Sequence, residues 1–559
     1  MPIVNLSISR LKKFLPDIDF DKILELLPYV GLDIESISSE IIRIEYNPNR
    51  PDFGSDYGIV RALRGLLEIE VGAPKFTYVS EDKYYVVNIV DESIKSVRPF
   101  VAAIVAKNGK LDDETIKQLI GMQEDLNNGI GRLRKKASIG IHNLDSIKFP
   151  VTYKTVDEDF SFVPLDRTSS QTIKAILKTS KSGKEYGYIL EKKSKNYPIL
   201  VDSENNVLSF PPIINSNLTK INKYSKSLFV EVTGTNQKSI EDILAILAIT
   251  LYDAGFQIQS VSIRNFDGTH YTAKMDPSDI SIDPHYINTM LGLDLGINLI
   301  VKYLHKSRLN AEEIDKNMIK CAIPRYRTDI FSGVDIVEEV AIGYGIYNLK
   351  PTIPYSNLTG DKSSLSRYID VIRQTMVGLQ MLEVTNFSLV SNKVQYGLSG
   401  MKSPAKILQL DGTKSEEHQI LRDTLLPSLL KTLSHNVHEE YPQKLFEIGK
   451  TFHLSDTIAE CWKVGAIIAH KNAEYTEIKS VMQALLRMAF GKNAETKVDT
   501  NPIFIAGRCA NIVVDEDCIG ILGEVTPLAI DSFKVRVPVA AFELNLSRLL
   551  SKYRRDLYF

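Results

Sequence analysis

The chain has 559 residues, which predicts three to five domains because a single hydrophobic core stops growing at about 250–300 residues. Hydrophobic residues make up 44% of it, yet no apolar run of about 18 residues and no signal-peptide core is present, so we expect a cytoplasmic protein. The formal net charge of −2 gives no overall sign of a nucleic-acid partner, although local basic patches would suffice for one.

The first 80 residues predict an N-terminal domain of short strands and helices. Residues 3–8 alternate like a strand, and residues 19–31 carry apolar side chains at helical spacing. In the segment NPNRPDFGSDYGIVRALRG, two prolines and a glycine indicate a turn, after which Ser55 or Asp56 can cap a helix. Three arginines lie in or beside this helix: Arg50, Arg61 and Arg64. A solvated helix face explains them better than contact with phosphates does.

Residues 81–270 predict an α+β domain. The β-branched runs YYVVNIV, FVAAIVA and KASIGIHNLDSI are followed by ILVDSENNVLSFPPIINSN and SLFVEVTGT, all of which read as strands. Residues 238–255 then have the length and apolar content of a helix. Strands followed by a closing helix are typical of an α+β domain, and a turn at Asp267–Gly268 ends it.

The rest of the chain contains a block at 271–350 and a final part at 351–559. The final part begins with the proline-bearing segment LKPTIPYSNLTGDK. Helical patterns follow at 363–379, around Leu425–Leu433 and at 477–490, and EVTNFSLV (383–390) reads as a strand. Five further strand-like runs lie at hairpin-sized spacings, which predicts an antiparallel sheet flanked by helices.

Common catalytic motifs are absent from the sequence. There is no P-loop, no G-x-G-x-x-G, no G-x-S-x-G and no H-E-x-x-H pattern, and the nine histidines are scattered. The four cysteines form no C-x-x-C pair, which argues against a zinc ribbon or a disulfide framework.

Four carboxylates gather in RTDIFSGVDIVEEVAIGYG (327–345): Asp329, Asp335, Glu338 and Glu339. If this stretch is helical, the last three share one face, and Asp329 can fold back towards them. Hard ions such as Mg²⁺ take oxygen ligands of this kind. Alternatively, Ser332 or Asp335 caps the helix and the acidic side chains complement its dipole. Spacing alone favours the second interpretation.

Two further stretches could form binding surfaces. In NNVLSFPPIINSNLTK and LFVEVTGT, a turn with amide and hydroxyl groups precedes a strand that places Glu231, Thr233 and Thr235 on one face. This set could line a polar pocket, or it could be an ordinary turn and a half-exposed strand. GRLRKKASIGIHNLD (131–145) could contact phosphates through its basic residues, or it could be a mobile solvated loop.

Taken in order, these stretches resemble the β subunit of phenylalanyl-tRNA synthetase of the archaeal and eukaryotic cytosolic type. NPNRPDFGSDYGIVRALRG resembles that family's N-terminal signature, and KKASIGIHNLD, FPPIINSNLTK and FVEVTGT resemble its B3/B4 editing domain. IPRYRTDIFSGVDIVEEVAIGYG resembles its B5 domain, and the region after about residue 350 resembles its synthetase-like module. The resemblance spans nearly the whole chain. The chain has no room for the OB-fold insert or the C-terminal anticodon-binding extension of the bacterial form.

The resemblance implies an α+β multidomain chain with four parts. These are an N-terminal α/β domain like B1 (1–80), a B3/B4 tRNA-editing domain (81–270), a B5 domain (271–350) and a class II synthetase-like antiparallel module (351–559). It also implies an α subunit that activates phenylalanine with ATP and charges tRNA(Phe), in an α2β2 heterotetramer. We expect no adenylation in this chain, because Glu447 lacks a preceding arginine and AAFELNLSRLL replaces the motif 3 helix.

The family's B5 motif implies Mg²⁺ ligands at Asp329, Asp335, Glu338 and Glu339, which reverses the preference from spacing alone. The editing domain implies hydrolysis of mischarged Tyr-tRNA(Phe), because a phenylalanine pocket cannot strongly reject a residue with one added hydroxyl. The candidates for reading that hydroxyl or positioning water are Glu231, Asn215 and Ser216. The candidates for contacts with the amino acid or the terminal adenosine are Thr233, Gly234 and Thr235, and His142 is a candidate general base or substrate contact.

Two alternatives remain at this point. A stand-alone hydrolase of mischarged tRNA would not need the roughly 200 residues of the C-terminal module. A tRNA-binding scaffold that no longer edits would not need the polar residues at Asn215, Glu231 and Thr233.

Overall fold

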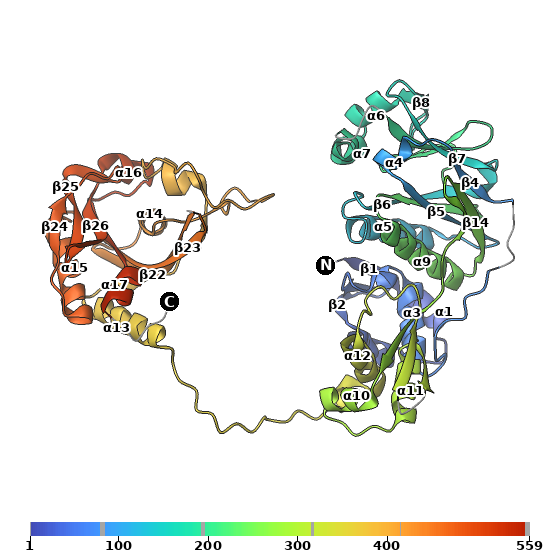
Figure 1. Ribbon diagram of the computed structural model, residues 1–559, viewed down its shortest axis with the longest axis horizontal. Helices are drawn as coiled ribbons and strands as arrows, with labels where there is room; N and C mark the ends of the chain where they lie inside the picture. Colours follow the sequence, from blue (N-terminus) through green and yellow to red (C-terminus); the bar gives the residue numbers. More distant parts are fainter. Residues whose placement is uncertain are drawn as a thin grey trace. The chain divides into compact units, whose positions relative to one another are not determined.

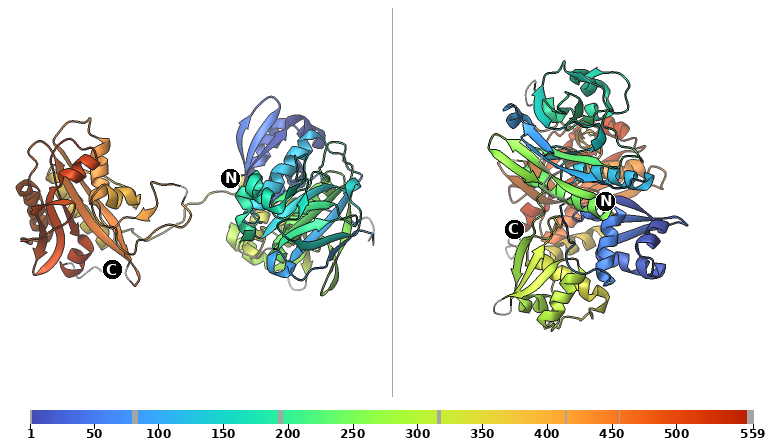
Figure 2. Two further views of the ribbon diagram at one scale, coloured as in Figure 1. Left: turned by 90° about the horizontal axis from the view of Figure 1, so that it is seen from above. Right: turned by 90° about the vertical axis from the view of Figure 1, so that its right-hand side faces the viewer.

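The computed structural model forms two compact units, residues Met1–Ile353 and Pro354–Phe559 (Figure 1). Figure 2 shows the same chain from two further sides. The domain boundary predicted at residues 80 and 81 lies outside the described part of the chain. The structure describes residues 2–78, 84–191, 196–314, 318–413, 415–454 and 456–553. Among the described helices, none has both the length and the apolar content that crossing a bilayer requires.

The N-terminal domain of the first unit is a small antiparallel sheet with three helices. Its strands lie in the order β1-β3-β2, and Ser55 caps the third helix by accepting a hydrogen bond from the Gly58 amide, as the sequence predicts. Leu6, Leu11 and Leu63 are fully buried in its core. The elements are β1 (Ile3–Ser7), α1 (Ile8–Phe14), α2 (Phe20–Leu26), β2 (Leu32–Ile37), β3 (Ile41–Tyr46) and α3 (Asp56–Leu66).

A ten-stranded sheet forms the largest part of the first unit. Its order is β12-β11-β10-β7-β4-β14-β5-β13-β6, with β15 paired to β14. The strands are β4 (Val86–Ile89), β5 (Phe100–Lys107), β6 (Ala137–Asn143), β7 (Val151–Val156), β10 (Tyr197–Val201), β11 (Val207–Phe210), β12 (Ile214–Asn215), β13 (Leu228–Gly234), β14 (Gln257–Asn265) and β15 (Gly268–Thr272). The domain boundary predicted at residues 270 and 271 falls inside β15, so this sheet extends to Thr272.

Helices α5 (Asp113–Asn128) and α9 (Gln237–Asp253) cover one face of this sheet (Figure 1). Along β13, Val230 and Val232 pack against these helices, whereas Phe229 belongs to the core on the opposite face. Because side chains alternate along a strand, Glu231 lies on the same face as Phe229. Shorter elements complete the domain: α4 (Ile94–Val97), β8 (Ser161–Phe162), β9 (Gln171–Thr172), α6 (Ile173–Thr179), α7 (Lys181–Tyr186) and α8 (Tyr188–Glu191).

The large sheet curls until its two ends meet. Five strands separate β11 from β13 in the sheet order, yet Ser209 on β11 donates a hydrogen bond to Glu231 on β13. The backbone amide of Asn143, at the end of β6, likewise reaches the carbonyl of Thr219 beyond β12. The curled sheet therefore brings two distant stretches of the chain, 205–220 and 228–235, to one place.

The last domain of the first unit packs three helices on a small antiparallel sheet, in the order β16-β18-β17. Its longest helix, α12 (Gly333–Tyr344), begins with a capping box in which Ser332 and Asp335 bond each other's backbone, so the predicted cap is confirmed. The other elements are β16 (Ser278–Ile282), α10 (Pro284–Leu291), α11 (Ile297–Lys306), β17 (Asn310–Ile314) and β18 (Met318–Ile323).

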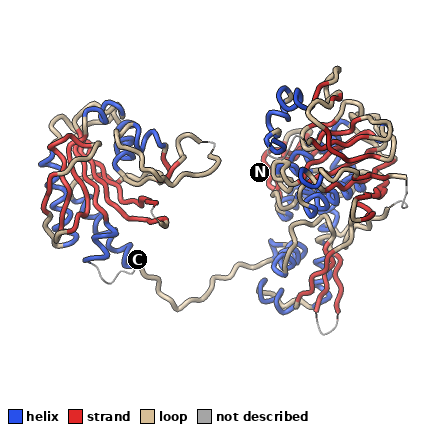
Figure 3. The backbone as a smooth tube through the Cα atoms, turned by 45° about the horizontal axis from the view of Figure 1, so that its top comes forward, coloured by secondary structure: helices blue, strands red, loops and turns tan. Residues whose placement is uncertain are grey.

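The second unit is a seven-stranded sheet with helices on both faces (Figure 3). Its order is β19-β22-β23-β27-β26-β25-β24. Among the described strands of this sheet, only β19 and β22 pair in parallel, which agrees with the predicted antiparallel sheet. The strands are β19 (Leu382–Glu383), β22 (Gln443–Leu454), β23 (Ile458–Ala469), β24 (Glu495–Val498), β25 (Phe504–Val514), β26 (Asp517–Val525) and β27 (Val539–Asn545). The helices are α13 (Ser364–Gly378), α14 (Leu426–His435), α15 (Tyr475–Phe490), α16 (Pro527–Ser532) and α17 (Leu546–Tyr553).

The prediction of one strand over residues 383–390 is wrong. Glu383 ends β19, and only Leu389–Val390 resume a strand, β20, which pairs with β21 (Ile420–Leu421) in a separate sheet. Between them, Asn386 turns aside to donate both its backbone amide and its side chain to the Glu447 carboxylate. A buried acceptor thus interrupts a stretch whose local pattern favours a strand.

Candidate functional site

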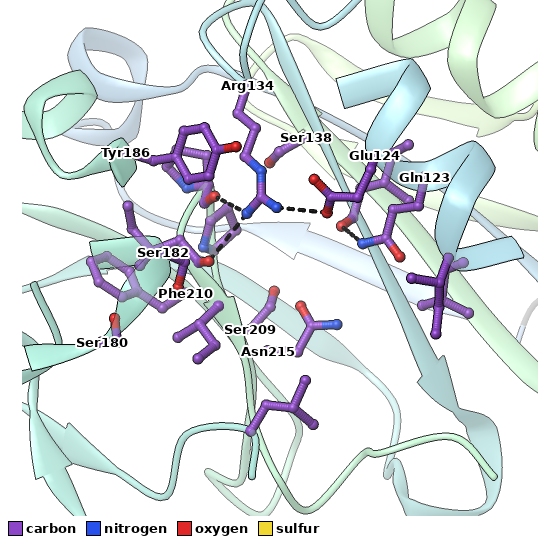
Figure 4. Close-up of a pocket in the computed structure, with 18 of the residues that line it drawn as sticks. Gln123, Glu124, Arg134, Ser138, Ser180, Ser182, Tyr186, Ser209, Phe210 and Asn215 are labelled. Atoms are coloured by element: carbon purple, nitrogen blue, oxygen red, sulfur yellow. Dashed lines mark hydrogen bonds and ion pairs between the residues drawn. The ribbon is translucent and has the colours of Figure 1, made fainter. Parts of the chain in front are cut away.

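A cavity of about 920 Å³ lies between α5, the edge strand β6, α7 and the β11–β12 turn (Figure 4). Its wall combines apolar side chains with many polar and charged ones, so it suits a ligand that is itself partly polar. Glu231 and Asn215, two of the predicted editing residues, line it. The polar groups that join them include Ser138, Ser209 and Thr219, and the apolar ones include Ile139, Phe210 and Ile213.

Glu231 is the most deeply buried carboxylate of this cavity, with 2% of its surface exposed. Its Oε1 accepts a 2.9 Å hydrogen bond from Ser209 Oγ, while its Oε2 has no hydrogen-bond partner among the described residues. A buried carboxylate oxygen without a donor is costly, so it is available to a ligand that brings one. Oε2 itself has almost no solvent-accessible surface, so a hydroxyl in the cavity would reach it after a small movement of the Glu231 side chain.

His142 lies behind Glu231. It is fully buried, its Nδ1 is 2.8 Å from Thr219 Oγ1, and its Nε2 is 3.8 Å from Glu231 Oε1, too far for a hydrogen bond. His142 does not line the cavity, so it borders the carboxylate rather than the space a ligand would fill. Gly140 faces both groups, since a Cβ there would lie 2.4 Å from Glu231 Oε1 and 2.6 Å from His142 Nε2.

Arg98, which sequence reasoning did not select, is buried beneath the same face of the sheet. Its guanidinium donates to Thr233 Oγ1 (3.0 Å), the Thr233 carbonyl (2.6 Å) and Ser138 Oγ (3.0 Å). Burial lowers the pKa of Arg98 to about 10, opposed in part by Tyr153 and by the negative charge of Glu231. Thr233 therefore holds a buried cation near Glu231, and it does not line the cavity.

The remaining predicted residues lie around the cavity. The Ser216 hydroxyl donates to the Val163 carbonyl, and Thr235 Oγ1 donates to the Lys135 carbonyl at 3.0 Å. Gly234 passes so close to the Lys136 carbonyl that a Cβ would lie 2.3 Å from it. None of these three residues lines the cavity, so Glu231 and Asn215 alone of the predicted editing set face it.

Arg134 and Glu124 form an ion pair at 2.8 Å on the cavity wall (Figure 4). The Arg134 guanidinium also donates to the carbonyls of Pro212 and Ile213 and lies over the Tyr186 ring, 4.3 Å from its centroid. Glu124 and Tyr186 carry no signal of their own in the sequence. Only the packing of α5 and α7 against the β11–β12 turn brings them to Arg134.

The four carboxylates of the predicted Mg²⁺ site divide into two pairs. Asp329 and Glu339 both bind the buried guanidinium of Arg327. Asp335 receives the amides of Phe331 and Ser332 on a single oxygen.

Glu338 is the least compensated of the four. Burial and the neighbouring charges of Glu339, Asp329 and Asp335 raise its pKa. Within the described residues, no three His, Cys, Asp or Glu side chains are arranged to hold a metal. Magnesium therefore stays a prediction, and Asp335 and Glu338 are the pair with uncommitted oxygens.

Two family models match the chain. Residues 280–346 match the tRNA synthetase B5 domain, and residues 349–546 match the phenylalanyl tRNA synthetase beta chain CLM domain. The first lies within the predicted B5 domain and the second within two residues of the start of the predicted C-terminal module.

Curated relatives match over nearly the full chain. The phenylalanine–tRNA ligase beta subunit of Archaeoglobus fulgidus is 39% identical over 98% of this chain and 98% of its own length. The corresponding subunits of Methanococcus aeolicus and Methanosarcina acetivorans are each 35% identical, over 98% and 99% of this chain and the whole of their own. A crystal structure of an N-terminal fragment of the beta subunit from Pyrococcus horikoshii is 30% identical, with a TM-score of 0.58 over 61% of this chain and 99% of the fragment.

Proposed function

The chain belongs to the family of phenylalanine–tRNA ligase beta subunits, and from this premise we propose that it hydrolyses mischarged Tyr-tRNA(Phe) in the cavity beside β6. The observation that carries the proposal is the Glu231 carboxylate, buried at the cavity wall with one oxygen uncommitted. A tyrosine side chain would satisfy that oxygen with its hydroxyl, and phenylalanine would leave it unpaired. Discrimination of this kind is strong, because the cost falls on the residue that lacks the donor.

The neighbours of Glu231 support this role. Ser209 fixes one oxygen of the carboxylate, so the other is presented in one orientation. The buried guanidinium of Arg98 and the imidazole of His142 lie on the same face of the sheet as Glu231. Asn215 lies on the cavity wall, where its amide can orient a water towards the ester, and a positioned water suffices for hydrolysis.

We assign phenylalanine activation with ATP, and the attachment to tRNA(Phe), to a partner alpha subunit in an α2β2 complex in the cytoplasm. In this chain the carboxylate that corresponds to the ATP-site glutamate, Glu447, is 1% exposed and pairs with Arg422 at 2.7 Å. Asn386 occupies its other oxygen, and α14 packs over the neighbouring sheet face. Because Arg422 and Glu447 are bound to each other, this pair does not offer a free guanidinium to clamp a triphosphate.

We further propose that Mg²⁺ binds at the start of α12, held by Asp335 and Glu338. Mg²⁺ commonly keeps several waters and uses only one or two protein carboxylates, which suits a site where Asp329 and Glu339 are already neutralised by Arg327. A cation there would offset the burial and the neighbouring negative charges that together raise the pKa of Glu338. The role of the ion would be to hold the acidic start of α12 in place.

The editing proposal is tested with Glu231→Ala in the chain assembled with its alpha subunit. We expect hydrolysis of Tyr-tRNA(Phe) to slow by about 10- to 150-fold, because the variant loses one hydrogen bond to a charged group. Phenylalanine charging should stay normal. Deacylation at the wild-type rate would remove Glu231 from the site. If the wild-type complex does not hydrolyse Tyr-tRNA(Phe) either, the chain is a tRNA-binding scaffold without editing.

A further inference from the structure

The loop between α5 and β6, residues 129–136 (the basic loop), has an unusual backbone conformation. Arg132, Leu133 and Arg134 have φ angles of 52°, 55° and 63°, so three successive non-glycine residues are left-handed. Each such residue costs about 1–2 kcal/mol, and runs of them are rare. Backbone strain of this kind persists where the surroundings impose it, and it is concentrated at functional sites.

The basic loop is held in this shape from both sides. The amides of Leu133 and Arg134 donate to the last carbonyls of α5, and the Lys136 amide donates to Gly131. On its other side, Thr235 donates its hydroxyl to the Lys135 carbonyl and its amide to the Lys136 carbonyl. These contacts make the loop a fixed feature of the structure rather than the mobile solvated loop that the sequence left open.

The fixed backbone sorts the basic side chains into two groups. Arg134 turns inward and is neutralised by Glu124 on the cavity wall (Figure 4). Arg132, Lys135 and Lys136 point to solvent, and no carboxylate of the described residues pairs with them. The Lys135 ammonium lies 5.4 Å from the ring centroid of Tyr188, which is 43% exposed. Three further exposed cations line the cavity itself, namely Arg167, Lys181 and Lys220, of which Lys220 is paired with Asp166.

We propose that the basic loop binds the backbone phosphates of the single-stranded 3′ end of tRNA, as it enters the cavity with its terminal amino acid. Unpaired cations beside an exposed aromatic ring are the usual means of holding single-stranded nucleic acid, because the cations follow the phosphates and the ring stacks on a base. The strained backbone serves to direct Arg132, Lys135 and Lys136 outward while Arg134 braces the wall. This assignment rests on the proposed editing function.

The test removes two charges from the basic loop without touching its backbone contacts. Lys135→Gln with Lys136→Gln is assembled with the alpha subunit, and binding of a labelled single-stranded RNA of about eight nucleotides is followed by fluorescence anisotropy from 0.05 to about 0.5 M salt. The loss of two phosphate contacts should reduce the magnitude of the slope of log K (the RNA association constant) against log salt concentration by about 1.4. Relative to 1 M salt, this corresponds to about 25-fold weaker binding at 0.1 M. The kcat/KM for Tyr-tRNA(Phe) hydrolysis should fall because KM rises, while kcat stays unchanged.

The matched control is Lys13→Gln with Lys110→Gln, which removes two exposed charges outside the cavity wall and the basic loop. We expect this control to keep the wild-type salt slope. If both double variants keep the wild-type salt slope, or if both reduce it equally, the basic loop does not contact the RNA and the assignment is overturned. A wild-type complex that binds the RNA through the loop but leaves Tyr-tRNA(Phe) intact would overturn the editing function and support the RNA contact. The two proposals can therefore fail separately.

Discussion

The substitution Gly140→Ala, which adds one methyl group, should slow editing without preventing the protein from folding. Gly140 on β6 lies opposite Glu231 in the strand pairing, and a Cβ there would sit 2.4 Å from Glu231 Oε1. Ordinary contact begins near 3.4 Å, so Gly140→Ala must push the carboxylate by about 1 Å. A displacement of this size is enough to lose the charged hydrogen bond to a tyrosine hydroxyl, about 1.5–3 kcal/mol, or 10- to 150-fold in kcat/KM for deacylation.

The assay compares Tyr-tRNA(Phe) hydrolysis and phenylalanine charging by the complete complex. We expect hydrolysis to fall and charging to stay within about twofold, because alanine costs a strand less than glycine does. Gly121→Ala is the control, since a Cβ at this exposed position on α5 meets nothing within 4 Å. Hydrolysis within twofold of wild type in a folded Gly140→Ala complex would refute the placement of the tyrosine hydroxyl at Glu231.

Two further predictions concern stability and metal binding. Although burial by itself would raise the pKa of Asp52, its ion pairs with Arg50 and Arg61 lower it to about 2. Because the pKa of Asp52 is lower in the folded than in the unfolded protein, its ionised form contributes about 2 kcal/mol of stability above about pH 4, and this is lost as the pH falls to about 2. Chemical denaturation across this pH range should show the loss in the wild type and a flatter dependence of the unfolding free energy on pH in Asp52→Asn. Crystals grown with Mn²⁺ should show an anomalous peak beside Asp335 that Glu338→Gln abolishes, and a wild-type crystal without the peak would contradict the magnesium site.

The local patterns of the sequence predict most elements correctly, for physical reasons that act over a few residues. The alternation in β1 and the cap at Ser55 depend only on neighbouring side chains, and both are present in the structure. The prediction fails at residues 383–390, where the Glu447 carboxylate, distant in the sequence, draws Asn386 out of a strand. Local propensity contains no information about such a partner.

The sequence by itself determined the family and the stretches that carry polar groups, because these follow from motifs and their succession. Tertiary structure decided which of those groups face one cavity. Pairing across the curled sheet set Glu231 against Ser209 and over Gly140, and it turned Thr233 towards the buried Arg98. The same folding fixed the basic loop, whose shape depends on Thr235, 100 residues further along the chain. Contacts between distant residues depend on how the sheet closes, and no local pattern records that closure.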